Sequence, residues 1–130
     1  MNRFVLGVGS NSSDRDWQIE NAIKWIKEKF SNVKLSSIYE TRASNGKDAD
    51  YINLVMRVDT HKSIEETTEM LKKYEAICGR TPASKLEGVI PIDLDIVVWN
   101  TEIVRPKEFD YPYFSRGYHE LLACGDIKAE

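Results

Sequence analysis

The sequence predicts an α+β fold in which one antiparallel sheet carries helices on one face. Four stretches have the short apolar runs or the two-residue alternation typical of β-strands, and two others have the spacing of amphipathic helices. They follow each other in the order β-α-β-β-α-β. In this ferredoxin-like order, antiparallel strands form one layer and the helices form a second layer against it.

Residues 4–30 predict the first strand and the first helix. Phe4 to Val8 is a short apolar run, and Gly9-Ser10-Asn11 closes it with a small-residue turn. Apolar residues then recur at helical spacing from Asp14 to Phe30. Ser13 followed by Asp16 is similar to a capping box, so we expect the helix to begin there.

The middle of the chain predicts two further strands and a long connection. Val33 to Glu40 alternates imperfectly, whereas Tyr51 to Val58 alternates cleanly and places Asn53 on the face opposite its apolar residues. The polar segment from Thr41 to Asp50 is longer than an ordinary hairpin connection. It is either a loop that closes over a ligand or a plain surface loop.

The second helix is predicted from Ser63 to Cys78. Ser63 and Glu66 form a capping box, and Gly79 is a typical residue for the position after a helix end. Arg80 to Ile90 then forms a loop that leads into the last of the four main strands.

The remainder predicts a short C-terminal extension of the fold. Ile103 and Val104 suggest a brief extra strand, and Ser115 to Cys124 suggests a terminal helix. Because proline lacks an N–H group, Pro106 and Pro112 are expected to interrupt regular structure.

Three helical side chains have an expected environment. We expect Trp17 and Trp25 to be packing residues, because aromatic side chains at helical spacing usually serve a core. We expect Glu75, near the end of the second helix, to be a solvated surface glutamate rather than a nucleotide contact.

The strand around Asp93 and Asp95 suggests a chemical site. In an extended chain the two carboxylates share one face, while the other face carries Ile92, Leu94, Ile96 and Val98. Two like charges on neighbouring same-face positions repel, and a bound Mg²⁺ ion would relieve that repulsion, because Mg²⁺ is typically held by one or two carboxylates, water and substrate phosphates. The alternative is two solvated aspartates on the wet face of a half-buried strand.

Composition and charge exclude several classes of protein. The 130 residues, 42% of them hydrophobic, fit a single domain over residues 1–130 with a substantial core. Eighteen basic and 21 acidic residues give a net charge of −3, which provides no general attraction to nucleic acid or to an anionic membrane. There is no membrane span or cleaved leader pattern, and Cys78 and Cys124 form no metal-ligand pattern, so we expect a cytoplasmic protein with reduced thiols.

Several motifs, taken together, resemble one enzyme family. In chain order they are Gly9-Ser10-Asn11, Ser37-Ile38-Tyr39-Glu40-Thr41, Asp50-Tyr51-Ile52-Asn53, Gly79-Arg80, Ile92-Asp93-Leu94-Asp95-Ile96 and Ser115-Arg116-Gly117-Tyr118. The chain resembles the 6-hydroxymethyl-7,8-dihydropterin pyrophosphokinases from about Phe4 to Leu122. The resemblance implies Mg²⁺-dependent transfer of pyrophosphate from ATP to the hydroxymethyl group of the pterin, with release of AMP, in folate synthesis.

The resemblance also implies roles for the charged residues. Asp93 and Asp95 match the aspartates that hold two Mg²⁺ ions between ATP and the pterin hydroxyl group. Arg80 matches an arginine of the mobile catalytic loop, and Arg116 matches one near the phosphates. Lys85 is a further candidate for nucleotide binding, and this equipment fits phosphoryl-type transfer, in which the protein positions reactants and neutralises charge.

Four other residues match the pterin-binding positions of the family. Asn53 matches a residue that hydrogen-bonds the pterin, and Tyr51 lines the same pocket. Thr41 lies where main-chain groups read the edge of the pterin, and Tyr118 occupies the position of an aromatic residue that stacks on the ring. We therefore expect a pterin-sized pocket between these four residues.

The chain departs from the family pattern on the ATP side. The usual loop arginines and a tryptophan are replaced by Pro82, Leu86, Glu87 and Ile90, and the later Pro-His-Tyr appears as Pro112-Tyr113-Phe114. A catalytically inactive relative that binds pterin, nucleotide or a protein partner is therefore an alternative. An RNA-recognition module has the same element order, but Tyr51 to Met56 lacks its aromatic pattern and paired aspartates would repel phosphates.

Overall fold

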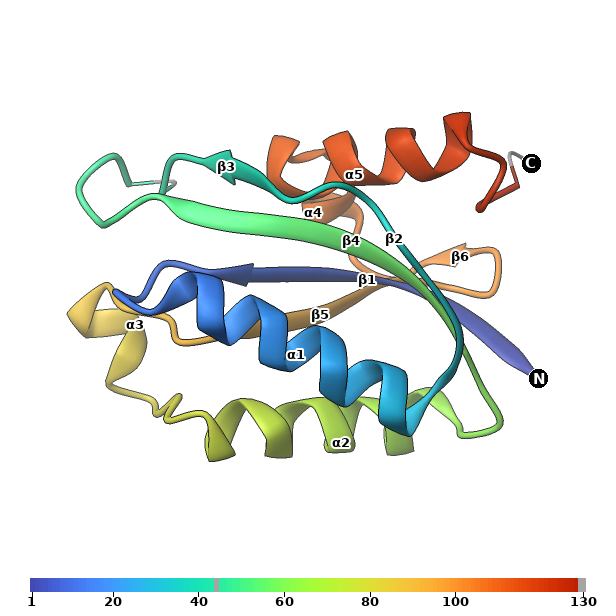
Figure 1. Ribbon diagram of the computed structural model, residues 1–130, viewed down its shortest axis with the longest axis horizontal. Coiled ribbons are helices and arrows are strands. Elements are labelled where there is room, and N and C mark those ends of the chain that lie inside the picture. The colour runs from blue at the N-terminus through green and yellow to red at the C-terminus, as the bar shows by residue number, and fades with distance from the viewer. Residues whose placement is uncertain (44, 129–130) are drawn as a thin grey trace.

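The structure, a computed structural model, describes residues 1–43 and 45–128 and confirms the α+β, ferredoxin-like prediction (Figure 1). The strands are β1 (Asn2–Ser10), β2 (Ser31–Leu35), β3 (Tyr39–Thr41), β4 (Tyr51–Thr60), β5 (Asp93–Trp99) and β6 (Glu102–Ile103). The helices are α1 (Arg15–Lys29), α2 (Ile64–Ile77), α3 (Ser84–Glu87), α4 (Pro106–Asp110) and α5 (Pro112–Ala123). The antiparallel sheet has the order β2-β4-β1-β5-β6, and β3 also pairs with β4.

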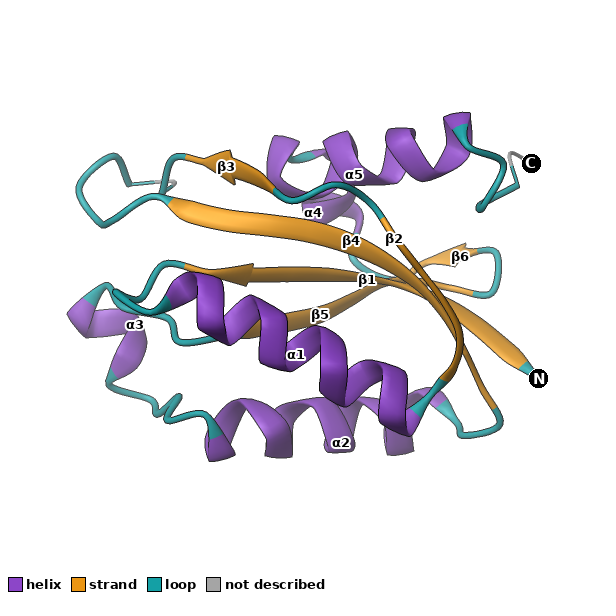
Figure 2. Cartoon of the chain, in the orientation of Figure 1, coloured by secondary structure: helices purple, strands orange, loops and turns teal. Residues whose placement is uncertain are grey.

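Helices α1 and α2 cover one face of the sheet, as predicted (Figure 2). The clean alternation of β4 points Leu54, Met56 and Val58 toward these helices, where they are fully buried. Complete burial of a side chain of this size contributes about 1.5–3 kcal/mol, so this layer is a major source of stability.

The two tryptophans of α1 lie in different environments. Trp25 is a packing residue, as predicted, and its ring stacks on that of Tyr74 with the centroids 4.4 Å apart. The same prediction is wrong for Trp17, which is 60% exposed. Trp17 lies two positions before the buried Ile19, and two residues turn an α-helix through about 200°, so the indole points away from the sheet.

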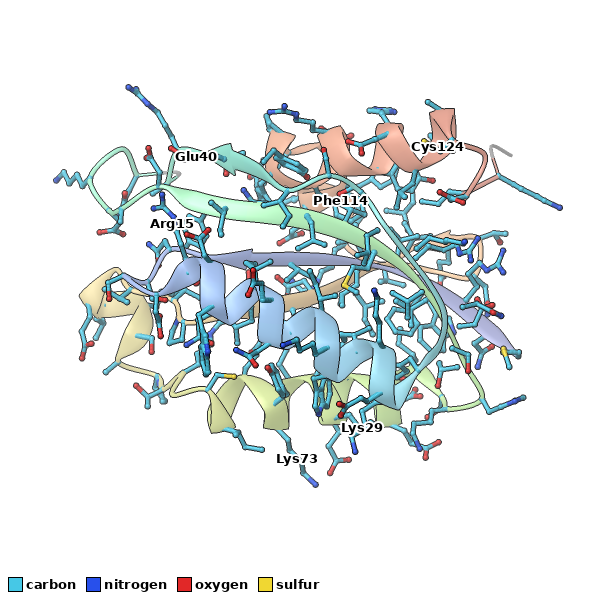
Figure 3. All side chains as sticks on the ribbon, viewed as in Figure 1. Arg15, Lys29, Glu40, Lys73, Phe114 and Cys124 are labelled. Carbon is cyan, nitrogen blue, oxygen red and sulfur yellow. The ribbon has the colours of Figure 1, made fainter. Side chains whose placement is uncertain are left out.

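Helices α4 and α5 lie on the opposite side of the molecule from α1 and α2, with α5 packed on the second face of the sheet (Figures 1 and 2). Phe114 is fully buried between α5 and the strands (Figure 3). Gly117 permits the close approach of α5, because a Cβ atom there would lie 2.5 Å from Cγ2 of Val55. Pro106 and Pro112 are the first residues of α4 and α5 instead of interruptions, since proline suits the first helical position.

A β-bulge in β5 changes the face of one predicted core residue. Leu6 pairs with Ile96, but the preceding Val5 pairs with Val98, so Val97 is an extra residue in the strand. Val98 therefore packs with the α5 side of the sheet, and its predicted place beside Ile96 is wrong. A bulge of this kind is invisible to a strict two-residue period.

The predicted strand from residue 33 to 40 is divided in two. Ser36 lies in the gap between β2 and β3, where its N–H donates to the Val55 carbonyl oxygen at 2.9 Å. Its Oγ accepts the Val55 N–H, also at 2.9 Å. The side chain of Ser36 thus replaces a strand partner, which explains the imperfect alternation.

The helix ends match the sequence expectations unequally. The capping box of Ser63 and Glu66 is confirmed, and Gly79 has the positive φ of 100° expected after a helix end. The cap predicted at Ser13 is wrong, because α1 begins after Asp14 without a side-chain cap hydrogen bond. The predicted loop 80–90 contains the short α3.

None of the helices in the described ranges has the length and apolar character needed to cross a membrane.

Candidate active site

The candidate site lies at the end of the second face where β1 ends and β4 and β5 begin. Gly9 in β1 is the register partner of Asn53 in β4 and of Asp93 in β5, so the three residues form a row across the sheet. Since neighbouring strands lie about 4.8 Å apart, the backbones of Asn53 and Asp93 are roughly 10 Å apart. Gly9 has no side chain, and the place that a Cβ atom would take there is bordered by Asn53 Oδ1 at 3.0 Å and by Cδ2 of the Tyr51 ring at 3.6 Å.

The next row marks the boundary of the open region. It consists of Val55, Gly7 and Asp95, and a Cβ atom at Gly7 would lie 3.2 Å from the ring of Phe114. Helix α5 therefore reaches this row, consistent with the side chain of Asp95 being only 15% exposed and that of Asp93 being 32% exposed. The row of Asn53, Gly9 and Asp93 thus forms a polar platform at the end of the sheet, next to the part of this face that α5 covers.

The two aspartates lie beside three side-chain cations. Burial raises the pKa of Asp93, the neighbouring charge of Asp95 raises it further, and the guanidinium of Arg80 opposes both effects. Arg80 Nη1 donates to Asp93 Oδ1 at 2.7 Å. On the other side, Lys72 Nζ and Arg105 Nη2 lie 3.3 and 3.5 Å from Asp95 Oδ1. Side-chain cations thus compensate the carboxylate pair.

Glu75 belongs to this cluster, and its predicted place on a solvated surface is wrong. The residue is only 4% exposed, and its Oε2 accepts the N–H of Leu94 at 2.8 Å. The same oxygen lies 3.2 Å from Lys72 Nζ and 3.3 Å from Arg80 Nη1. Among the described strands, β6 pairs with β5 only near Trp99, so the Leu94 N–H on the open edge needs a side-chain acceptor.

The donor set fits a Mg²⁺ ion shared with a phosphate ligand. Residues 1–43 and 45–128 contain no group of three or more His, Cys, Asp or Glu side chains arranged to hold a metal. Mg²⁺ usually keeps several waters and takes only one or two protein carboxylates together with substrate phosphates. Asp93 and Asp95 provide those two carboxylates on one face of β5.

The structure brings three of the expected pterin residues together. Asn53 is buried, and its Nδ2 donates to Oγ1 of Thr41 at 2.7 Å. The Tyr51 ring lies beside Gly9, with its Cδ2 3.6 Å from the place that a Cβ atom of that glycine would take. Burial raises the pKa of Tyr51, and the negative charge of Asp93 raises it further. Thr41, Tyr51 and Asn53 therefore gather at the same end of the sheet as Asp93.

The two predicted site residues of α5, Tyr118 and Arg116, have other contacts. The ring of Tyr118 lies 4.9 Å from that of Phe109 and 5.6 Å from that of Phe114, within the packing between α4 and α5. The guanidinium of Arg116 lies 4.9 Å from the centre of the Tyr39 ring. The predicted roles of Tyr118 in stacking and of Arg116 in phosphate binding stay predictions.

Tyr113 is near the carboxylates although no role was predicted for it. Burial raises its pKa, and the negative charges of Glu108, Asp95 and Asp93 raise it further. The sequence indicated only that this tyrosine stands in an altered Pro-His-Tyr segment, and the packing of α5 brings it to the site.

The sequence model of the family described as 7,8-dihydro-6-hydroxymethylpterin-pyrophosphokinase (HPPK) matches residues 5–122. The chain belongs to the HPPK family. A 2-amino-4-hydroxy-6-hydroxymethyldihydropteridine pyrophosphokinase from Aquifex aeolicus is 32% identical over 114 residues, which span 87% of this chain and 71% of that protein. The protein of the same name from Haemophilus influenzae is 27% identical over 121 residues, spanning 90% of this chain and 74% of its own. A folate synthesis bifunctional protein from Arabidopsis thaliana is 27% identical over 133 residues, or 95% of this chain and 28% of its own.

Two clefts of this HPPK family member lie along the edge of β5. The larger, of about 320 Å³, is lined by Lys72, Glu75, Ala76, Arg80, Thr81, Pro82 and Lys85. The smaller, of about 160 Å³, is lined by Ile64, Thr68, Leu71, Lys72, Leu94, Asp95, Ile96, Val104 and Arg105. The predicted nucleotide residues Arg80 and Lys85 therefore share one cleft.

The positions where the HPPK family pattern has further loop cations do not supply them here. Leu86 is 92% exposed, and Ile90 is buried. The sequence reasoning missed Lys72 and Arg105, which approach Asp95 from α2 and from the residue before α4. Neither residue lies in a motif, so a spatial arrangement was needed to find them.

Asn11 holds together the two loops that border the HPPK site. Its Nδ2 donates to the carbonyl oxygens of Gly88 at 2.8 Å and Ala49 at 3.2 Å. Its Oδ1 accepts the N–H of Ile90 at 2.6 Å. The small-residue turn after β1 thus positions the segments on both sides of the platform.

Proposed function

We propose that this protein catalyses the Mg²⁺-dependent transfer of pyrophosphate from ATP to 6-hydroxymethyl-7,8-dihydropterin, with release of AMP, as a step of folate biosynthesis. The row of Asn53, Gly9 and Asp93 is the observation that carries the proposal. A flat heterocycle would lie along this row, with its polar edge at the buried amide of Asn53 and its hydroxymethyl group toward the carboxylates. Membership of the HPPK family, whose members use ATP and Mg²⁺, supports the same reaction.

The transfer makes and breaks one bond at the β-phosphorus of ATP. The pterin hydroxyl oxygen bonds to that phosphorus, while the bond to the oxygen shared with the α-phosphate breaks and leaves AMP. The hydroxyl proton passes to solvent. Because such reactions require mainly positioning and charge neutralisation, the side chains need not form a covalent intermediate.

The residues divide the work between the two substrates. Asn53, Thr41 and Tyr51 orient the pterin from β3 and β4, with Tyr118 as the proposed stacking residue. A buried amide that both donates and accepts hydrogen bonds can read the edge of a planar heterocycle and disfavours ligands that leave it unpaired.

Charged side chains serve the nucleotide. Asp93 and Asp95 would hold two Mg²⁺ ions, which when bound supply neutralisation of the phosphate charge. Arg80 and Lys85 line the cleft beside the carboxylates, and Arg116 is proposed to meet the phosphates from α5. The proposed partners are therefore ATP and the reduced pterin.

Formation of AMP tests the proposal. Purified protein is incubated with ATP, Mg²⁺ and 6-hydroxymethyl-7,8-dihydropterin, and AMP and the pyrophosphorylated pterin are quantified. We expect equal amounts of both products, formed only with Mg²⁺, and loss of both in Asp95→Asn. Asp110→Asn, at an exposed position of α4, is the matched control and should keep the activity.

Absence of AMP from the folded wild-type protein would overturn the proposal. Calorimetric titration with a pterin analogue then identifies the remaining role. Binding without turnover would identify a catalytically inactive relative, and no binding with or without Mg²⁺ and nucleotide would remove the pterin pocket as well.

A further inference from the structure

Lys72 lies where the two clefts along β5 meet. It is the residue shared by the linings of both clefts, and its side chain is 43% exposed. Its Nζ lies 3.2 Å from Glu75 Oε2, 3.2 Å from the carbonyl oxygen of Leu94 and 3.3 Å from Asp95 Oδ1. A half-exposed ammonium is thus held at the inner edge of the site by three acceptors.

Lys72 and Arg80 flank the carboxylate pair from opposite ends. Arg80 contacts Asp93, Lys72 contacts Asp95, and Glu75 lies between the two cations, with its Oε2 near both. Both cations therefore come from the same part of the chain: Lys72 belongs to α2, and Arg80 follows shortly after the end of that helix. The segment over residues 84–90, which contains the short α3, adds only Lys85 as a basic side chain.

A ligand that fills both clefts must pass Lys72. The charges of the side chains around Lys72 also allow an anion to bind there. Asp93, Asp95 and Glu75 are paired with Arg80, Lys72 and Arg105, and Arg105 also pairs with Glu108. Divalent cations bound at the aspartates would add positive charge to this cluster, so the side-chain cations would be released for another anion. A lysine suits this exchange, because its ammonium is a mobile point charge on a flexible stem.

We propose that Lys72 binds the phosphates of the nucleotide in this protein and that it exchanges its bond to Asp95 for one to a phosphate oxygen when metal and nucleotide arrive together. The proposal rests on the proposed function. It assigns to α2 part of the cationic contribution that the segment over residues 84–90 does not make.

The exchange predicts effects of opposite sign in one variant. In Lys72→Gln, Asp95 has lost a competing cation, so Mn²⁺ alone should bind about two- to fivefold more tightly, as expected for loss of a partly exposed ion pair. The same variant should bind α,β-methylene ATP with Mg²⁺ roughly 10- to 100-fold more weakly, because a hydrogen bond to a charged phosphate is lost. Lys72→Arg, which keeps the charge, should restore most of the nucleotide affinity.

Lys73→Gln is the matched control. Lys73 is the next residue of the same helix, is 73% exposed, and pairs with Glu69 on the side away from the sheet (Figure 3). Its substitution removes the same charge from the protein without touching the carboxylates. Both affinities should therefore match those of the wild type.

The experiment consists of calorimetric titrations of the whole protein with Mn²⁺ alone and with α,β-methylene ATP plus Mg²⁺, for wild type and the three variants. Equal nucleotide affinity in Lys72→Gln and Lys73→Gln would overturn the proposal, as would wild-type protein that does not bind the analogue. Weaker binding of both Mn²⁺ and nucleotide would also overturn it, because it indicates that Lys72 only supports the local structure.

The AMP assay separates this inference from the proposed function. Wild-type turnover together with unchanged nucleotide affinity in Lys72→Gln defeats the inference alone. Absence of turnover defeats the proposed function, while the two titrations still decide the part played by Lys72.

Discussion

Replacement of Asp93 by asparagine should stabilise the metal-free protein at pH 8. The substitution keeps the shape of the side chain and leaves an oxygen that can still accept from Arg80, but it removes a carboxylate charge beside Asp95. Burial and the charge of Asp95 raise the pKa of Asp93, so ionisation costs more in the folded chain than in the unfolded chain.

The magnitude follows from two opposing terms. Side chains two residues apart on a strand are separated by roughly 6.5 Å, and at an effective dielectric constant of about 20 two such charges repel by about 2.5 kcal/mol. Partial exposure reduces this value, and loss of the ion pair with Arg80 takes back up to about 1 kcal/mol. We expect Asp93→Asn to gain about 1 kcal/mol of unfolding free energy at pH 8.

The pH dependence gives the sign of the effect independently. Because the folded pKa of Asp93 is raised, its carboxylate destabilises the fold fully above that pKa, and the effect fades as the pH falls toward the ordinary aspartate value near 4. Urea unfolding with a metal chelator should therefore show a gain at pH 8 that is nearly absent at pH 3. Asp110→Asn is the control and should differ from wild type by less than about 0.5 kcal/mol at either pH.

Two results would refute this reasoning. A loss of stability at pH 8 would mean that the ion pair between Arg80 and Asp93 outweighs the carboxylate repulsion. A gain of equal size at both pH values would mean that a steric effect, and not the charge, is responsible. In the expected case, saturating Mg²⁺ should stabilise the wild type more than the variant, because a ligand of the folded state raises its stability.

Gly117→Ala should lower the unfolding free energy by about 1–2 kcal/mol in urea titrations, since its Cβ would lie 2.5 Å from Cγ2 of Val55. The better helix propensity of alanine offsets only part of this overpacking. A neutral outcome would contradict the close packing of α5. Asn11→Ala should lower the unfolding free energy by about 2–3 kcal/mol in the same assay, because it leaves the buried Ile90 N–H without its side-chain acceptor. It should also increase hydrogen exchange in both loops that Asn11 joins. Unchanged exchange in the loop before β5 would show that Asn11 does not hold that loop. Asn53→Ala should weaken calorimetric binding of a pterin analogue about tenfold or more while leaving nucleotide binding unchanged, and equal loss of both affinities would place the defect in the fold.

The sequence by itself determined the order of the main strands and the face on which the site residues of β4 and β5 lie. Two-residue alternation placed Asn53 opposite Leu54 and Met56, and it placed Asp93 and Asp95 opposite Ile92, Leu94 and Ile96. Such patterns are reliable because they depend on local backbone geometry and on the burial of one apolar face. The ordered motifs likewise indicated the family before any contact was known.

The tertiary structure alone decided which side chains meet the aspartates. Lys72 and Glu75 looked like ordinary charged residues of an amphipathic helix, and only the open edge of β5 shows why they turn inward to Leu94 and Asp95. The bulge at Val97 and the close approach of Gly117 to Val55 are also long-range matters of register and packing. No period along the chain encodes these features, because each depends on a partner that is distant in the sequence. In the same way, a backbone N–H group without a partner at a strand edge is satisfied by whichever acceptor the fold brings there.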